Sequence, residues 1–203
     1  MSGARDLPRA ARAVEELLRA IGAPVDEDPE LSGTAQRVAL AWSEELLAGY
    51  AMDPATLLAD ATASSSEGLV VLANLPATTM CPHHLMPATG VAHVGYLPGA
   101  RVVGFGAIGA VVDCFTRRLA RQEDAARNIA ESLARELDAP FAAALLDLDP
   151  TCATARGDRR HGARALTLAF AGARAQDEAL RAELLSTLSI AATGVRDAAT
   201  RPT

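Results

Sequence analysis

Hydrophobic positions in the first part of the chain recur every three or four residues, which is typical of amphipathic helices. The spacing predicts one helix over residues 5–21 and a second over residues 34–49. A polar stretch of small residues, 60–68, follows and predicts a loop. We therefore expect residues 1–60 to form a helical extension that packs against something else.

The pattern changes after residue 68, where apolar runs become short or alternate with polar positions. Five runs predict strands, at residues 69–75, 90–96, 101–104, 141–148 and 164–170. The second and third are expected to form a hairpin around Pro98 and Gly99. Helical spacing returns at 122–137 and at 176–190, and the tail to Thr203 is expected to fray.

This order of elements predicts an α+β fold with an antiparallel sheet and long helices. We divide the 203 residues into a helical extension (1–60), a central domain (61–175), and a C-terminal helix with its tail (176–203). The length suits one domain with such an extension.

Composition narrows the class of partner. Aromatic residues make up only 3% of the chain and the net charge is −6, so neither base stacking nor a basic field favours nucleic acid or an anionic membrane. No stretch approaches the roughly 20 apolar residues that span a bilayer, and the N-terminus lacks the apolar core of a secretory signal. Three cysteines do not indicate a disulfide framework, and we expect a cytoplasmic protein.

The densest group of potential metal ligands is Cys81-Pro82-His83-His84, and Cys152 follows much later in the chain. Two thiolates and one imidazole form a ligand set that binds zinc and leaves one position for water. Zinc lowers the pKa of such a water toward neutrality and so supplies hydroxide for hydrolysis. Taken alone, this spacing leaves zinc binding and plain burial of the cysteines equally open.

The surrounding sequence, CPHHLMPATGVAHVGYLPGARVVGFG, resembles the signature of the GTP cyclohydrolase I family, in which Cys-Glu-His-His-Leu-x-Pro precedes a strand ending in Tyr-x-Pro. The resemblance continues through Gln122-Glu123 and through Cys152-x-x-x-Arg156-Gly157. It extends back to LSGTAQRVALAWSEELLAGY and covers roughly residues 10–172.

Membership of this family implies a tunnelling fold, in which antiparallel sheets of several subunits close a barrel. It implies a homo-oligomer, commonly a decamer of two rings, with active sites at subunit boundaries. The implied reaction opens the imidazole ring of GTP, releases C8 as formate and forms 7,8-dihydroneopterin triphosphate for pterin and tetrahydrofolate biosynthesis.

By position, the resemblance also implies roles for individual residues. The Zn²⁺ ligands would be Cys81, His84 and Cys152, and His83 would be the catalytic histidine that moves protons at the purine ring. The substrate-binding residues would be Gln122, Glu123, Arg156 and Arg37, with Glu123 accepting hydrogen bonds from the guanine edge. Without the resemblance, Glu123 is interpreted as an ordinary acidic residue in the first turn of a helix.

The sequence departs from the family pattern at one proton-transfer position and along one phosphate-binding segment. Pro150 stands where the family has a second catalytic histidine, and Pro82 replaces the glutamate of the Cys-Glu-His-His motif. Gly106, Ala107 and Ala110 stand where the family has Ser, Lys and Arg of the triphosphate-binding segment.

Nearby groups offer partial compensation. Three arginines beside the site, Arg159, Arg160 and Arg164, either hold phosphates or simply solvate a turn, and the sequence favours neither. His161 can in principle replace the missing histidine, although surface exposure is the simpler interpretation. His93 and Cys114 are interpreted as structural residues.

Three functional hypotheses follow. The first is a zinc-dependent hydrolase of the GTP cyclohydrolase I type. The second is a zinc hydrolase that opens another guanine-type purine lacking the triphosphate. The third is a non-catalytic relative in which the metal is structural, but such a protein has no need of His83 or Glu123.

Overall fold

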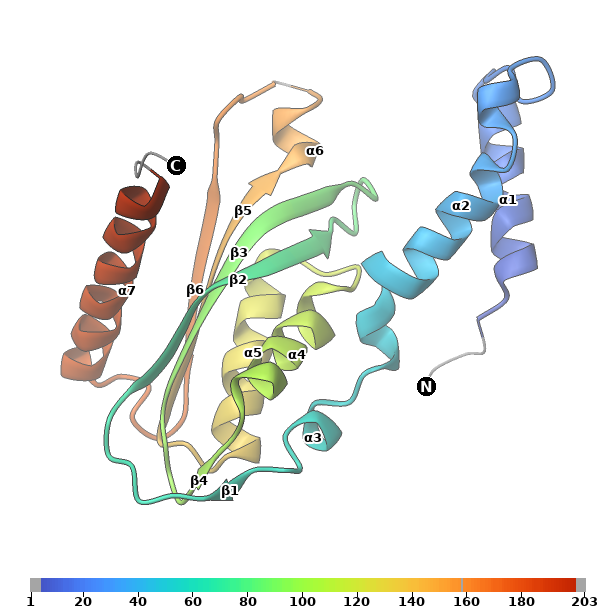
Figure 1. The fold of residues 1–203 in the computed structure, drawn as a ribbon. Coiled ribbons are helices and arrows are strands. Elements are labelled where there is room, and N and C mark those ends of the chain that lie inside the picture. Colours follow the sequence, from blue (N-terminus) through green and yellow to red (C-terminus); the bar gives the residue numbers. More distant parts are fainter. Residues whose placement is uncertain (1–4, 158, 200–203) are drawn as a thin grey trace.

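A four-stranded antiparallel sheet forms the centre of the computed structural model, which describes residues 5–157 and 159–199 (Figure 1). The strands are β2 (Val70–Met80), β3 (Pro87–Leu97), β5 (Phe141–Pro150) and β6 (Ala165–Ala171), in the spatial order β2-β3-β5-β6. Helices α4 (Phe105–Thr116) and α5 (Gln122–Glu136) cover one face of the sheet. Helix α7 (Glu178–Ala199) lies on the opposite face. This arrangement confirms the predicted α+β class with long helices on an antiparallel sheet.

The main hydrophobic core lies between the sheet and the pair α4 and α5. Alternate residues of the central strands point into it, so that Val94 and Tyr96 of β3 and Leu146 of β5 are almost fully buried. Tyr96 and Phe141 are the only aromatic side chains among the largest fully buried ones in the described residues. Alanine, leucine and valine fill most of the remaining space, as the low aromatic content requires.

A smaller core lies on the other face of the sheet. Leu180 and Leu184 of α7 pack there against Phe141 and Ala143 of β5. The first half of α7 therefore covers the part of the sheet where β5 begins, which is the end farthest from Pro150. The opposite end of the sheet carries the candidate active site.

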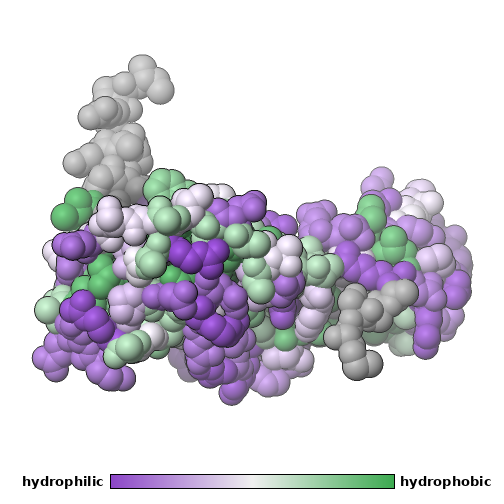
Figure 2. Space-filling model, turned by 90° about the horizontal axis from the view of Figure 1, so that it is seen from below, coloured by the Kyte–Doolittle hydropathy of each residue, from purple (hydrophilic) through white to green (hydrophobic). Residues whose placement is uncertain are grey.

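The N-terminal helices α1 (Leu7–Ala20) and α2 (Thr34–Ala41) pack on each other and project from the sheet, with the 3₁₀ turn η1 (Pro29–Leu31) between them (Figure 1). In Figure 2 they form the lobe on the right, joined to the larger body by a narrower region. The chain then returns to the body through α3 (Pro54–Leu57). Leu58, just after α3, is 1% exposed and belongs to the main core.

Two sequence predictions in the central region are wrong. The strand predicted at 101–104 does not form a hairpin with β3: β4 (Arg101–Val102) pairs instead with β1 (Thr62–Ala63), inside the segment expected to be a loop. β3 pairs with β2 and β5 along its length, so both of its edges are already used. Helix α4 was not expected, because its sequence FGAIGAVVDCFT is hydrophobic nearly all round and gives no amphipathic pattern.

The predicted helices differ from the observed ones at their ends. The helix expected over 34–49 is three pieces, α2, a π-helical turn η2 (Trp42–Leu46) and a 3₁₀ turn η3 (Ala48–Ala51). The C-terminal helix extends to Ala199, so the expectation of a frayed tail is wrong for residues 191–199, and residues 200–203 lie outside the described residues. Among the helices described, none is both long and apolar enough to cross a membrane.

Candidate active site

The three predicted metal ligands lie at the same end of the sheet because of its topology. β2 and β3 are joined by the short turn that contains Cys81 and His84, and β5 ends two residues before Cys152. β3 is the common neighbour of β2 and β5, and Ala88 at its start pairs with Pro150. The β2–β3 turn and the end of β5 are therefore adjacent, although the two cysteines are far apart in sequence.

The ligand atoms of Cys81, His84 and Cys152 all lie within 4.8 Å of one another. Cys81 Sγ lies 3.6 Å from His84 Nδ1. Backbone hydrogen bonds fix the turn, because the Leu85 N–H donates to the Cys81 carbonyl (2.9 Å) and the Cys81 N–H donates to the Met86 carbonyl (2.9 Å). Two thiols and one imidazole grouped in this way fit zinc, which favours sulfur and nitrogen ligands in tetrahedral geometry.

The electrostatics of Cys152 also fit a cation site. Its partial burial, together with the neighbouring thiol of Cys81, raises the pKa of Cys152 above the usual range, while Arg156 opposes this effect. Two thiolates in contact repel each other, and a positive charge beside them relieves that repulsion. A divalent cation supplies that charge, and metal binding at such a site releases protons.

His83 lies beside this group and does not belong to it. Its side chain is exposed, and its ring centroid lies 6.3 Å from that of His84 in an edge-on arrangement. His83 therefore presents its imidazole to solvent beside the group that can hold a metal.

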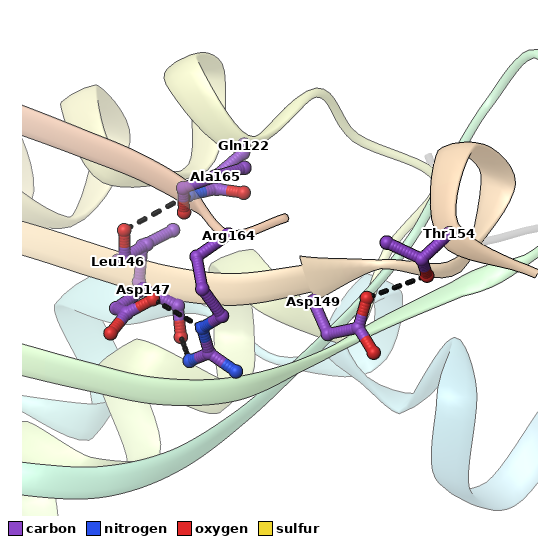
Figure 3. Close-up of polar contacts among 7 residues, drawn as sticks. All are labelled: Gln122, Leu146, Asp147, Asp149, Thr154, Arg164 and Ala165. Carbon is purple, nitrogen blue, oxygen red and sulfur yellow. Dashed lines mark hydrogen bonds and ion pairs between the residues drawn. The ribbon is translucent and has the colours of Figure 1, made fainter. Parts of the chain in front are cut away.

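Gln122 has an unexpected set of partners. Its side-chain amide donates hydrogen bonds to the carbonyl oxygens of Leu146 (2.9 Å) and Ala165 (2.7 Å), which belong to β5 and β6 (Figure 3). Its Nε2 group therefore ties the start of α5 to two strands. Without the Gln122 side chain, the carbonyl oxygens of Leu146 and Ala165 would lose these two hydrogen bonds.

The other predicted substrate-binding residues are exposed and lie on different elements. Glu123 is exposed in the first turn of α5, and Arg156 is exposed beyond Cys152. Arg37 is exposed on α2, where its guanidinium donates to the Ser32 carbonyl (2.9 Å) and to Thr34 Oγ1 (2.9 Å).

The positions that depart from the family pattern lie at the end of a strand and in the first half of a helix. Pro150 is the last residue of β5, and Gly106, Ala107 and Ala110 lie in the first half of α4. Arg164 is engaged by Asp147, with Arg164 Nε lying 2.7 Å from Asp147 Oδ1 (Figure 3). His161 is exposed, as expected.

The sequence pattern did not point to the two hydroxyl residues on either side of Cys152. Thr154 donates a hydrogen bond to Asp149 Oδ1 (2.7 Å; Figure 3). The Thr151 hydroxyl donates to the Pro87 carbonyl. A signal was available, because threonines one residue before and two residues after a cysteine in a turn commonly bond to nearby acceptors.

Comparison with known proteins agrees with this arrangement. The description of the GTP cyclohydrolase I family matches residues 10–189. The GTP cyclohydrolase 1 of Corynebacterium glutamicum is 38% identical over 186 residues, covering 89% of this chain and 92% of the relative. That of Chromobacterium violaceum is 40% identical over 177 residues, covering 84% of this chain and 85% of the relative.

Similarity to solved structures is weaker. The archaeosine synthase QueF-Like in the apo form matches with a TM-score of 0.44 and 18% identity, covering 54% of this chain and 97% of that one.

The fold and the site together define an α+β protein with a two-cysteine, one-histidine group that can hold a metal at one end of an antiparallel sheet. The extent of the sequence match decides the family. This chain belongs to the GTP cyclohydrolase I family.

Proposed function

We propose that this protein is a zinc-dependent GTP cyclohydrolase I that opens the imidazole ring of GTP, releases C8 as formate and forms 7,8-dihydroneopterin triphosphate. The observation that carries the proposal is the meeting of Cys81, His84 and Cys152 in a chain that matches this family over residues 10–189. The product would serve pterin and tetrahydrofolate biosynthesis. The three free cysteines suit the reducing cytoplasm.

Zinc held by two thiolates and one imidazole leaves one coordination position for water and lowers the pKa of that water, which is the chemistry needed for attack on C8. His83, exposed beside the metal ligands, would protonate the ring nitrogen that leaves. Glu123 would accept hydrogen bonds from N1–H and the 2-amino group of guanine, and Arg156 would meet a phosphate.

Gln122 would contribute by holding α5 against the sheet. Its bonds to Leu146 and Ala165 fix the helix turn from which the neighbouring Glu123 projects. Met80, directly before Cys81, accepts a hydrogen bond from the Ala120 N–H (3.2 Å), so the start of α5 is also tied to the end of β2. The first turn of α5 and the turn that carries Cys81 and His84 would therefore be held in one frame within the chain.

The protein would act as a homo-oligomer, with a decamer as the form expected for the family. Within the described residues, β2 and β6 each pair along one edge only, and such edges need pairing or protection. Leu166 on β6 is 66% exposed, which also favours contact with another subunit. Active sites at subunit boundaries would bring Arg37 of one subunit to the substrate bound by another.

One observation favours a second candidate, a zinc hydrolase for a guanine-type purine without the triphosphate. Ala107 and Ala110 carry no charge where the family binds phosphates, and Arg37 and Arg164 already have partners within the chain.

The test is incubation of the zinc-loaded protein with GTP, GMP, guanosine and guanine, with formate release and pterin fluorescence as readouts. We expect formate and a fluorescent pterin from GTP, and no reaction with His83→Ala. Turnover should be slow, because Pro150 cannot move a proton and loss of acid–base assistance typically lowers a rate by about 10²- to 10⁴-fold. Formate from guanosine or guanine but not from GTP would support the second candidate.

A further inference from the structure

The segment that carries Cys152 has little intrinsic rigidity. It is the single helical turn α6 (Thr151–Thr154), and helices this short are unstable on their own. The connection to β6 then continues through irregular turns with positive φ at Gly157, Arg159 and Gly162. Backbone hydrogen bonds from Ala155 to Thr151 (2.9 Å) and from Arg160 to Ala153 (3.1 Å) close the segment on itself, so side-chain contacts are needed to tie it to the strands.

Two threonine hydroxyls provide these contacts, one on each side of Cys152. Thr154 is 7% exposed and donates to Asp149 Oδ1 (2.7 Å), which ties α6 to the end of β5 (Figure 3). The Thr151 hydroxyl donates to the carbonyl of Pro87, the first residue of β3. Pro87 directly follows the turn that holds Cys81 and His84, so this second bond joins the two halves of the ligand group.

Asp147 and Asp149, the acidic residues near the end of β5, each bind a residue of the connection to β6. Leu146 and Leu148 point into the main core, so strand alternation directs Asp147 and Asp149 to the other face. Arg164 engages Asp147 and Thr154 engages Asp149. The two ends of the β5–β6 connection are thus both fixed to the same strand, and Cys152 lies within that connection.

We propose that Thr154 and Asp149, together with Thr151, are positioning residues that hold the Cys152 sulfur at metal-binding distance from Cys81 and His84. The inference rests on the proposed function for the identity of the metal. Zinc accepts sulfur at about 2.3 Å and imidazole nitrogen at about 2.0–2.1 Å, so a small shift of α6 weakens the site. Substitution of a residue that orients a metal ligand typically lowers metal affinity by about 10- to 100-fold.

The test measures the zinc dissociation constant by competition with a chromophoric chelator. Thr154→Val keeps the shape of the side chain and removes the hydroxyl, and we expect it to weaken zinc binding by about 10- to 100-fold. Thr154→Ser restores the donor and should bind zinc nearly as the wild type does. Asp149→Ala should weaken zinc binding to the same extent. The variant with both substitutions should bind zinc as well as either single variant, since each substitution removes the same hydrogen bond.

A second readout is independent of activity. In the cobalt-substituted protein, the visible absorption bands report the geometry of thiolate and imidazole ligands, and Thr154→Val should alter their position or intensity. Thr116→Val is the matched control, because Thr116 is also buried and its hydroxyl makes one good bond, to the Val112 carbonyl (2.8 Å). The control should leave both zinc affinity and cobalt spectrum unchanged.

Wild-type zinc affinity in Thr154→Val and Asp149→Ala would overturn the proposal, as would an equal loss in Thr116→Val. If Thr154→Val does not fold, Asp149→Asn and Asp149→Ala give the same comparison. Asp149→Asn retains an acceptor oxygen and should bind zinc nearly as the wild type does, whereas Asp149→Ala should bind it more weakly. A wild-type protein that binds no zinc would instead overturn the metal assignment in the proposed function, which distinguishes the two failures.

Discussion

The metal ligands and the predicted substrate-binding residues behave differently in the single chain. Cys81, His84 and Cys152 meet within 4.8 Å because two strand ends lie side by side at one end of the sheet. Arg37 lies on a projecting helix and bonds to its own loop, and Glu123 is exposed on α5.

One chain therefore brings the three proposed metal ligands together, whereas Arg37 and Glu123 stay exposed on separate helices. The sheet topology fixes ligands that lie on neighbouring strand ends. The helical extension does form a pocket with its own chain, lined by residues of α1 and α2 together with Leu85 and Arg118, but Arg37 and Glu123 do not line it. The proposed oligomer would supply the missing walls.

The largest expected effect is loss of the metal site itself. Cys152→Ser should abolish tight, stoichiometric zinc binding and reduce GTP turnover to background, because one of three ligands is gone. Elemental analysis of the purified variant, with circular dichroism for the fold, measures this. Cys114→Ala is the control, since Cys114 is buried away from the site against Arg118 (3.1 Å from its Sγ) and should retain zinc.

Mixing two inactive variants tests whether the substrate site is shared between subunits. Cys152→Ser and Glu123→Ala should each be inactive alone. If the metal and the guanine-binding carboxylate of one site come from different subunits, co-refolded equimolar mixtures should regain about a quarter of wild-type activity by statistical assembly. Mixtures that stay inactive, although light scattering shows a mixed oligomer, would place the metal ligands and Glu123 of one site in the same chain.

A smaller effect is expected from Gln122, which joins the start of α5 to β5 and β6. Gln122→Ala removes the donors to two strand carbonyls, Leu146 and Ala165, and should lower the free energy of unfolding by about 1–3 kcal/mol. Urea denaturation measures this change. A variant that is as stable as the wild type but has a raised KM would mean that Gln122 acts mainly on the substrate.

The smallest expected effect is a pH dependence at His93, which lies in the sheet outside the metal group. Its Nδ1 accepts a hydrogen bond from the Asn74 N–H (3.3 Å), and burial lowers the pKa of His93, with Asp147 opposing. Folding thus favours neutral His93, so its stabilising contribution is complete above the unfolded pKa of about 6.5 and is lost as the pH falls through the lower folded value. Between about pH 7.5 and pH 5.5, the wild type should lose more unfolding free energy than His93→Gln. An identical loss of unfolding free energy in the wild type and in His93→Gln would mean that His93 does not cause the pH dependence.

Sequence patterns predicted the parts of the structure that depend on local periodicity or on a recognisable motif. The helix over 122–137, the strands around Gly90–Tyr96 and Phe141–Leu148, and the ligand group at Cys81 belong to this class. Cys114 was also correctly predicted to be buried.

The remaining features depend on tertiary contacts that local patterns do not report. Helix α4 is apolar on nearly every side because the sheet, α3 and α5 surround it, so it has no amphipathic signature. Residues 101–104 have the composition of a hairpin partner, but β3 already pairs on both edges. The bonds of Gln122 to Leu146 and Ala165, and that of Thr151 to Pro87, link residues whose proximity arises only after the strands have paired.

The most direct test of the account is the ratio of kcat/KM for GTP and GMP in the zinc-loaded protein. The central claim is that the metal site is complete while the phosphate-binding segment has lost the charges at Ala107 and Ala110. Each charge-assisted hydrogen bond contributes about 1.5–3 kcal/mol, so two retained contacts would favour GTP by about 10²-fold or more. We predict less than about tenfold preference for GTP, with the reaction abolished in His83→Ala. A preference of about 10²-fold or more would contradict the claim and would mean that other cations, such as Arg156 and Arg159, bind the triphosphate.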